Sequence, residues 1–361
     1  MSILEKCVQC GSCLPACPLF RLTKLESLSP RGKLYYMMVK KNMSISSEIE
    51  NQFNNALFAC THCGACSEVC DSDVDILELF LENKGENALL NPTPEFKQLT
   101  ERILSTGNIF GLDNEDRIEL LLDEVEEEIE DIRERIWEDG KAAKVTFFLG
   151  CMPSLKSSLI DASLSSFKVL EKLNIDYVLL GGEEFCCGHP LDVIGLKDQV
   201  KEIREHNTEI LNTTGADTII TNCPGCLAAL THHYDLDVRI MHLTEFIEQY
   251  LPDKIPNPLT NKTIAYHEPC DLTRICEVVE PPIRILQKIG VKLIELEPSC
   301  CGGGGMMRLA HENLSQGVIR KRITDNNIRN IVTCCPSCEE QFKAEGIETF
   351  DLMELVDEAL G

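Results

Sequence analysis

A pair of adjacent cysteines followed by glycine occurs twice in this chain, and further cysteines flank each such pair in the same order. Gly188 follows the first pair, Gly302 follows the second, and a C-P-x-C run lies beyond each. Corresponding cysteines stand 112 (335 − 223) to 119 (270 − 151) residues apart, which indicates a duplicated domain. The first set is Cys151, Cys186, Cys187, Cys223 and Cys226, and the second set is Cys270, Cys300, Cys301, Cys335 and Cys338. Because thiolates bind zinc and iron–sulfur clusters, we expect each set to meet at one site.

A tetrahedral zinc site suits neither set. Zinc takes four ligands, two neighbouring cysteines cannot both enter one such site without strain, and a fifth thiolate would be surplus. A larger iron–sulfur assembly uses all five thiols. We therefore predict an iron–sulfur cluster at each set, with zinc at one of the two as the alternative. We take these ten cysteines as metal ligands and as catalytic residues.

Two further cysteine runs lie near the start of the chain. Residues 7–18 match the ferredoxin pattern C-x2-C-x2-C-x3-C-P, and residues 60–71 repeat it with Asp71 in place of the proline. In that pattern three thiolates of a run hold one cluster, and the fourth reaches the other cluster. The spacing therefore predicts two [4Fe-4S] cubanes, one held by Cys7, Cys10, Cys13 and Cys70, and the other by Cys60, Cys63, Cys66 and Cys17. Two structural zinc sites are the alternative, but they give no reason for this spacing.

Composition limits the class of protein. The 361 residues include 20 cysteines and are 43% hydrophobic, which is enough for two or three domains with their own cores. No charged and then apolar leader precedes Cys7, so we expect a reducing, cytoplasmic location. No apolar run approaches the ~18 residues of a membrane span, so any membrane link must come through a partner. The formal net charge of −25 disfavours binding to nucleic acid.

The first two parts of the chain are predicted to be helical. Residues 1–100 should form a helical ferredoxin-like domain, with a helix over 33–41, because the insert between the cysteine runs is too long for a compact small ferredoxin. Residues 101–143 should form an acidic helical linker. Its apolar residues recur at spacings of four and three, which predicts one stripe on a long helix that packs on the chain itself or on a partner protein. The stripe consists of Ile118, Leu122, Val125, Ile129, Ile132 and Ile136.

The duplicated parts, residues 144–256 and 257–361, alternate strand-like and helix-like patterns, which predicts α/β domains with largely parallel sheets. The expected strands are 144–150, 176–180, 218–221, 263–266, 291–296 and 330–332. Because ligands gather at the C-terminal ends of parallel strands, the cysteines that follow these strands can meet there. The predicted fold class is thus an α+β multidomain protein with a helical ferredoxin-like domain and two α/β domains.

The sequence resembles a known family, that of the cysteine-rich or CCG domain of heterodisulfide reductases and related iron–sulfur oxidoreductases. The resemblance is carried by residues 186–188 with 223–226, and by 300–302 with 335–338. With the ferredoxin-type runs, the order of parts is similar to that of the D-type catalytic subunit. The resemblance implies that each set of five binds a non-cubane [4Fe-4S] cluster, and that the two clusters face the disulfide between coenzyme M and coenzyme B.

The same layout is similar to the iron–sulfur subunits of flavin-dependent glycolate, lactate and glycerol-3-phosphate dehydrogenases, which share the Ser-Pro-Arg-Gly stretch at 29–32. Thiol:fumarate reductase has a similar iron–sulfur component. These resemblances imply a protein that only transfers electrons. Such subunits often have incomplete cysteine sets, whereas both sets here are complete, and this favours disulfide chemistry.

The sequence does not decide the roles of several residues near the cysteines. Cys334 adjoins Cys335, and the C-x-x-C spacing favours Cys335 as the ligand. Cys276 has no assigned role. His189 and His267 lie where a proton donor to a product thiolate would belong, or they are structural. The glycine run 302–305 has no phosphate-loop signature and favours close backbone approach to cluster sulfides.

We therefore expect an oxidoreductase that passes electrons through two cubanes to the sets of five and reduces a small-molecule disulfide. The sequence has no flavin or nicotinamide motif. A redox partner is required, and it would be a flavoprotein, an iron–sulfur protein or a cytochrome subunit.

Overall fold

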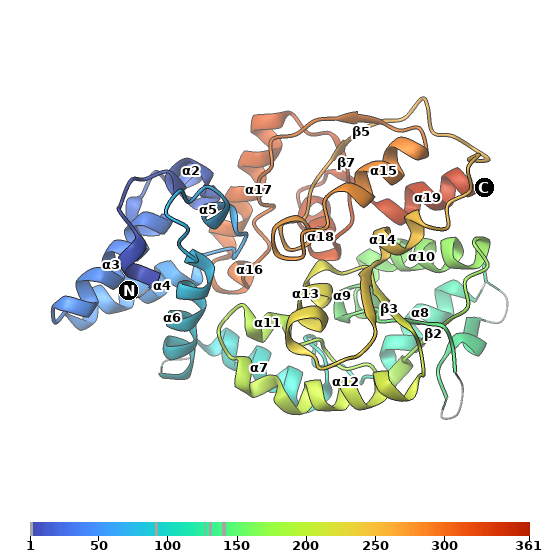
Figure 1. Cartoon of the computed structure of the whole chain (residues 1–361), viewed down its shortest axis with the longest axis horizontal. Coiled ribbons are helices and arrows are strands. Elements are labelled where there is room, and N and C mark those ends of the chain that lie inside the picture. Colours follow the sequence, from blue (N-terminus) through green and yellow to red (C-terminus); the bar gives the residue numbers. More distant parts are fainter. Residues whose placement is uncertain (1–2, 91–92, 127, 130–131, 139–141) are drawn as a thin grey trace. The chain divides into compact units, whose positions relative to one another are not determined.

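The computed structural model describes residues 3–90, 93–126, 128–129, 132–138 and 142–361. The chain divides into two compact units (Figure 1). Unit 1 comprises Met1–Gln98, Pro190–Gln199 and Pro298–Asn327. Unit 2 comprises Leu99–His189, Val200–Glu297 and Ile328–Gly361. Each unit therefore contains segments that are far apart in the sequence.

The described residues of unit 1 form helices and loops and contain no strand. Local sequence sets where its helices begin: the Ser29 hydroxyl accepts a hydrogen bond from the Gly32 amide at 3.0 Å, and Pro30 fixes the first turn of α3. Leu34, Phe53 and Phe80 form its core. The helices are α1 (Cys13–Ala16), α2 (Pro18–Thr23), α3 (Pro30–Asn42), α4 (Ser47–Phe58), α5 (Ala65–Glu68), α6 (Ile76–Leu90), α16 (Met307–Ala310) and α17 (Glu312–Asn326), with short 3₁₀ turns at Ile3–Lys6 and Glu26–Leu28.

Unit 2 contains two four-stranded sheets in which every pair of neighbouring strands is parallel. The orders are β2-β1-β3-β4 and β6-β5-β7-β8, so the second sheet repeats the first. The duplicated, largely parallel α/β fold predicted from the sequence is confirmed. The strands are β1 (Val145–Phe147), β2 (Tyr177–Leu179), β3 (Thr218–Thr221), β4 (Arg239–His242), β5 (Thr263–Tyr266), β6 (Lys292–Ile294), β7 (Asn330–Thr333) and β8 (Glu348–Asp351).

The helices of unit 2 alternate with the strands, except that α8 (Asp116–Val125) precedes β1 and α19 (Leu352–Leu360) follows the last strand. Those between parallel neighbours form the crossovers that parallel pairing requires. The remaining helices are α9 (Cys151–Leu155), α10 (Ile160–Lys172), α12 (Lys201–Thr213), α13 (Pro224–His233), α14 (Leu243–Glu248), α15 (Glu280–Lys288) and α18 (Pro336–Ala344). Helices α7 (Pro94–Thr106) and α11 (His189–Asp192) cross the limits of the two units. A π-helix, η7, spans Asp271–Ile275.

One hydrophobic core joins the two sheets. Phe147 of β1, Phe167 of α10, Val332 of β7 and Leu355 of α19 are all buried in it. Helices α10 and α19 lie side by side in this layer (Figure 1). On the opposite face of the first sheet, Ile219 packs with residues of α12 and α13 in a second cluster. The first sheet is thus covered on both faces, which is the usual arrangement for parallel strands.

The long helix predicted for the acidic segment is wrong. Helix α8 ends at Val125, and the next helical turn is a 3₁₀ turn at Ile132–Arg135. Arg133 Nη1 lies 3.4 Å from Glu119 Oε1, whereas fourteen residues of continuous helix would separate them by about 21 Å. The chain turns back instead, and Ile118 and Ile132 still reach the shared core. Residues 127, 130–131 and 139–141 of the segment lie outside the described residues.

We predict that Phe167→Ala destabilises unit 2 by about 3–5 kcal/mol, because it leaves a cavity in the shared core. The Phe167 ring is fully buried, 5.9 Å from the Phe147 ring and 6.4 Å from the Tyr177 ring. Leu104→Ala on α7, where the side chain is 45% exposed, should cost less than about 0.5 kcal/mol. Anaerobic denaturant titrations give both values. Equal losses would show that the core is not shared as described.

Candidate functional site

Two cavities in unit 1 are lined by cysteines. The first contains the thiols of Cys7, Cys10, Cys13 and Cys70. The second contains the thiols of Cys17, Cys60, Cys63 and Cys66. Each cavity therefore brings together one of the two crossed sets that the spacing predicts. Four thiols around one hollow are the donor set that a [4Fe-4S] cubane takes, so the residues present fit such a group.

The two cysteine loops have the same backbone conformation. Gln9 and His62 both have φ = 58°, and Gly11 and Gly64 have φ = 90° and 75°. Left-handed residues at matching places turn each loop tightly, so that its three cysteines face one side. A Cβ at Gly11 would also lie 2.8 Å from Nη1 of Arg31, so a larger residue would require the Arg31 side chain to shift.

Helix α3 places one cation at each cavity. Arg31 lines the first cavity, and Lys33, two residues later, lines the second. The Lys33 side chain is buried, with Nζ 5.4 Å from the centre of the Phe80 ring. Burial raises the pKa of the Cys17 thiol to about 11, and the charge of Lys33 opposes that shift. The Ser-Pro-Arg-Gly-Lys stretch thus serves both cavities.

A second buried lysine lies beside the second cavity. Lys84 Nζ donates to the Cys60 carbonyl at 3.4 Å and to the Val193 carbonyl at 3.1 Å. Burial lowers the pKa of Lys84 to about 8. Sequence reasoning missed both lysines, because neither adjoins a cysteine in the chain.

The glycine run at 302–305 lies against the second cysteine loop within unit 1. A Cβ at Gly304 would stand 2.5 Å from the Thr61 carbonyl oxygen, and one at Gly305 would stand 2.3 Å from that of Cys60. The glycine run therefore approaches the backbone of this cysteine loop closely, whereas its approach to cluster sulfides stays a prediction. A contact with the Cys300 thiol, together with burial, raises the pKa of Cys63. Cys300 thus touches a thiol of the second cavity.

The first set of five meets at one point in unit 2. Its thiols contact one another in the order Cys151, Cys186, Cys187, Cys226 and Cys223. Cys151 begins α9 after β1, and Cys223 is the N-cap of α13 after β3. A Cβ at Gly150 would lie 2.8 Å from Cys226 Sγ, so the glycine leaves room at the sulfurs. Five converging thiols with a glycine wall fit an iron–sulfur group.

Hydrogen bonds fix the loop that carries the adjacent cysteines. The Asn207 side chain of α12 donates to the carbonyl groups of Phe185 and Cys186 and accepts from the Phe185 amide. The Tyr234 hydroxyl donates to the Cys187 carbonyl at 3.2 Å. Contacts with the thiols of Cys186 and Cys226 lower the pKa of Cys187. Hydrogen bonds from two side chains thus hold the backbone of this loop in place.

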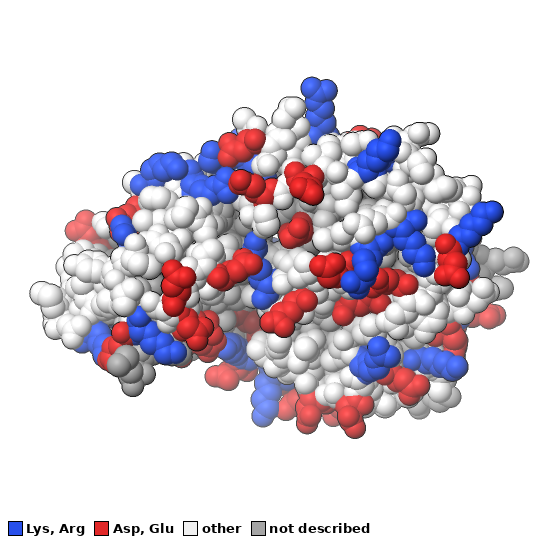
Figure 2. Space-filling view, turned by 45° about the horizontal axis from the view of Figure 1, so that its top comes forward, with Lys and Arg blue, Asp and Glu red and all other residues white. Residues whose placement is uncertain are grey.

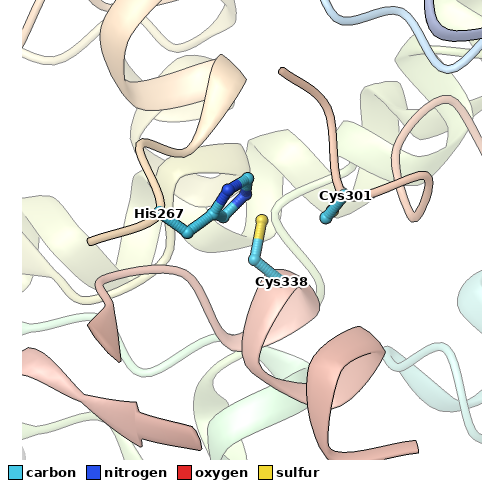
Figure 3. A group of neighbouring side chains, drawn as sticks. All are labelled: His267, Cys301 and Cys338. Atoms are coloured by element: carbon cyan, nitrogen blue, oxygen red, sulfur yellow. The ribbon is translucent and has the colours of Figure 1, made fainter. Parts of the chain in front are cut away.

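The second set of five is divided between the units. Cys300 and Cys301 belong to unit 1, whereas Cys270, Cys335 and Cys338 belong to unit 2. Cys335 is the N-cap of α18, as Cys223 is of α13. Figure 3 shows the His267 ring pointing toward Cys338, and a ring nitrogen and the sulfur lie within 4.8 Å. Cys301 in the same figure is the unit 1 residue.

The structure defines the surroundings of the residues whose roles the sequence does not decide. Cys334 Sγ lies in the shared core, 3.5 Å from the Tyr266 hydroxyl oxygen. Cys276 is half-buried, and burial raises the pKa of its thiol to about 12. His189 Nε2 lies 3.5 Å from Asp271 Oδ2, and its ring would be 2.8 Å from a Cβ at Gly225. His189 therefore adjoins the turn that holds Cys223 and Cys226.

A buried ion pair supports the first set. Arg117 of α8 and Glu184 are both buried, with Nη1 and Oε1 2.9 Å apart. The Glu184 carboxylate accepts from the amides of Leu149 and Gly150, just before Cys151. Sequence reasoning missed both residues. No distinguishing signal was present in the sequence, because Arg117 is one of three arginines in the acidic segment that adjoin the apolar stripe.

The comparisons with known proteins agree with this geometry. The 4Fe-4S dicluster domain model matches residues 3–74, and the cysteine-rich domain model matches residues 145–231 and 264–343. These matches define an iron–sulfur redox protein with a dicluster domain and a duplicated cysteine-rich domain. No helix in the described part of the chain is long and apolar enough to cross a membrane. On the face drawn in Figure 2, acidic and basic side chains are interspersed.

The chain belongs to the family of the D-type subunits of heterodisulfide reductases. It is 30% identical to the D-type subunit of the dihydromethanophenazine:CoB--CoM heterodisulfide reductase of Methanosarcina acetivorans, over 99% of this chain and 94% of the relative. It is 26% identical to the B-type subunit of the fumarate reductase (CoM/CoB) of Methanothermobacter marburgensis, over 99% and 72%. It is 25% identical to EtfAB:quinone oxidoreductase of Syntrophomonas wolfei subsp. wolfei, over 99% and 58%.

A crystal structure of a hypothetical protein from Helicobacter pylori has a similar fold, with a TM-score of 0.61 and 14% sequence identity. The match covers 99% of this chain and 72% of that one. At this identity the likeness concerns the fold alone.

We predict that Cys70→Ser and Cys17→Ser each remove one cubane, and that the two variants lose different ones. Cys70 lies with Cys7, Cys10 and Cys13, and Cys17 lies with the other loop. Each variant should lose about four irons per chain, measured by metal analysis and by the missing cluster signal in electron paramagnetic resonance (EPR) spectra.

Cys276→Ser is the matched control and should keep all its iron, since Cys276 lines neither cavity. If Cys70→Ser and Cys60→Ser abolished the same signal, the ligand sets would not be crossed.

Proposed function

We propose that this chain reduces the mixed disulfide of two small thiols, the heterodisulfide of coenzyme M and coenzyme B. The observation that carries the proposal is the first set of five, whose thiols are linked by successive contacts, with four of the cysteines buried and Cys223 half-buried. The relative from Methanosarcina acetivorans supports this substrate by its name, and the fumarate reductase relative is named for the same two thiols. The reaction adds two electrons and two protons to the S–S bond and releases two thiols.

The proposed ligands are the eighteen cysteines of the four sets. When bound, the cubanes would carry single electrons, and non-cubane [4Fe-4S] clusters would offer iron to the sulfur atoms of the substrate. The chain itself supplies thiolates, excludes water by burial and holds the loops in place. Asn207 and Tyr234 perform the last task for the adjacent cysteines of the first set.

The difference in solvent exposure between the two cysteine cavities of unit 1 suggests a route for the electrons. Cys10 of the first cavity is exposed, and Val8 beside it is 71% exposed. Cys63 and Cys66 of the second cavity are buried, and Cys63 contacts Cys300. We infer that a donor delivers electrons at the first cavity and that they leave through the second toward Cys300.

Two histidines suit the proton transfers. His189 adjoins the first set, with Asp271 3.5 Å from its Nε2. The His267 ring adjoins Cys338 of the second set. In this proposal each histidine holds a proton for one product thiolate, so that the two halves of the chain treat the two sulfurs alike.

The relatives are named as reductases, oxidoreductases or their subunits, so a redox partner is expected. The proposed donor is a flavoprotein, an iron–sulfur protein or a cytochrome subunit. The second candidate function is electron transfer for a flavin-dependent dehydrogenase of 2-hydroxy acids or glycerol 3-phosphate, or for a thiol:fumarate reductase. The fumarate reductase and EtfAB relatives favour it.

We predict that the anaerobically purified chain, with a reduced dye as donor, consumes the coenzyme M–coenzyme B disulfide. Cys187→Ala and Cys301→Ala should each abolish turnover, because each removes a thiolate from one set. Cys276→Ala should keep the wild-type rate. Dye oxidation and free thiol formation measure the reaction, with fumarate and 2-hydroxy acids as competing substrates.

A fully loaded protein that ignores disulfides, yet takes electrons from a flavin dehydrogenase and its hydroxy acid, would establish the second function instead. A Cys187→Ala or Cys301→Ala variant with full activity would refute the mechanism that uses both sets.

A further inference from the structure

We propose that Arg117 is a positioning residue for the first set of five, and that its positive charge raises the reduction potential of the cluster bound there. This inference rests on the proposed cluster at that set. Arg117 lies outside the residues that match the cysteine-rich domain, which begin at residue 145. It comes from the acidic segment, for which the sequence indicated only packing.

The guanidinium touches the set directly. Arg117 Nη2 lies 3.6 Å from Cys151 Sγ, within the range of a hydrogen bond to sulfur. Its Nη1 donates to Ser154 Oγ at 2.8 Å and to Glu184 Oε1 at 2.9 Å. Nη2 also lies 3.3 Å from Asn114 Oδ1. These contacts hold the planar group in one orientation, with one edge toward the sulfur.

The charge acts in a dry place. Arg117, Glu184 and Cys151 are all buried, so water screens their interactions little. Arginine stays protonated in proteins, so its positive charge is permanent. Adding an electron makes a cluster more negative, and a fixed cation in contact with a ligand sulfur stabilises the reduced form. The reduction potential must therefore rise relative to the same site without the cation.

Glu184 offsets part of the positive charge of Arg117, but its carboxylate oxygens accept hydrogen bonds from backbone amides. One carboxylate oxygen accepts a hydrogen bond from the Leu149 amide at 2.8 Å, and the other accepts one from the Gly150 amide at 2.7 Å. The Glu184 carboxylate thus accepts hydrogen bonds from two amides and from Arg117. Of this ion pair, only Arg117 donates to the Cys151 sulfur. Removing the carboxylate charge should raise the potential, and removing both charges should lower it.

The test is an EPR-monitored redox titration of the full-length, anaerobically purified protein. The signal of the first-set cluster is identified as the one that Cys187→Ala removes. Arg117→Met combined with Glu184→Gln avoids a buried unpaired carboxylate, and should lower the potential of that signal by at least about 59 mV, a tenfold shift for one electron. Glu184→Gln alone should raise it. Arg117→Lys, which keeps the charge, should restore most of the wild-type value.

Ser154→Ala is the matched control, since it removes a hydrogen bond to Arg117 without changing any charge. Its potential should stay within about a tenth of the shift in the double variant. Potentials that are the same in the wild type, Glu184→Gln and the double variant would overturn the inference. If the double variant holds no cluster, the comparison of Glu184→Gln with the wild type decides alone.

These outcomes separate the inference from the proposed function. If Cys187→Ala removes no EPR signal and no iron, the first set holds no cluster and both proposals fail. If the signal is present but unaffected by the charges, only the role of Arg117 fails. A shift in potential without turnover of the disulfide would leave the role of Arg117 standing and refute the substrate.

Discussion

Thiolates buried away from water are the constraint on which this structure depends. A negative sulfur in a dry interior is unfavourable unless a metal, a cation or hydrogen-bond donors offset its charge. The chain supplies cations where its thiols converge. Lys33 and Lys84 lie by the second cavity of unit 1, and Arg117 touches the first set in unit 2. The chain as a whole carries a net charge of −25, yet positive side chains are buried beside its cysteines.

The parallel sheets solve the problem of bringing distant thiols together. The strands of each sheet all run in the same direction, so the segments that follow them lie at the same edge of the sheet. Cys151 and Cys223 stand after β1 and β3, and Cys335 stands after β7 in the same manner. Duplication of this arrangement gives two sheets on one shared core, and cysteines of both sets of five follow their strands. A reaction that produces two thiols from one disulfide is well matched to two such sets.

Much of this organisation could be predicted from the sequence, because cysteine spacing and strand–helix alternation are local patterns. The edge strands β4 and β8 were missed because their short segments, Arg239–His242 and Glu348–Asp351, are partly polar and partly exposed. The acidic segment was read as one helix because its apolar spacing continues past the turn at which α8 ends. Arg117 and Lys84 could not be found, since their burial depends on tertiary contacts.

The central claim is that the duplicated domain holds clusters in addition to the two cubanes. Analysis of iron, acid-labile sulfide and zinc in the anaerobically purified chain tests it most directly. We expect about sixteen irons per chain, four at each of four sites, with little zinc. A value of about twelve irons with one zinc would make one set of five structural. About eight irons would show that the duplicated domain holds no cluster at all.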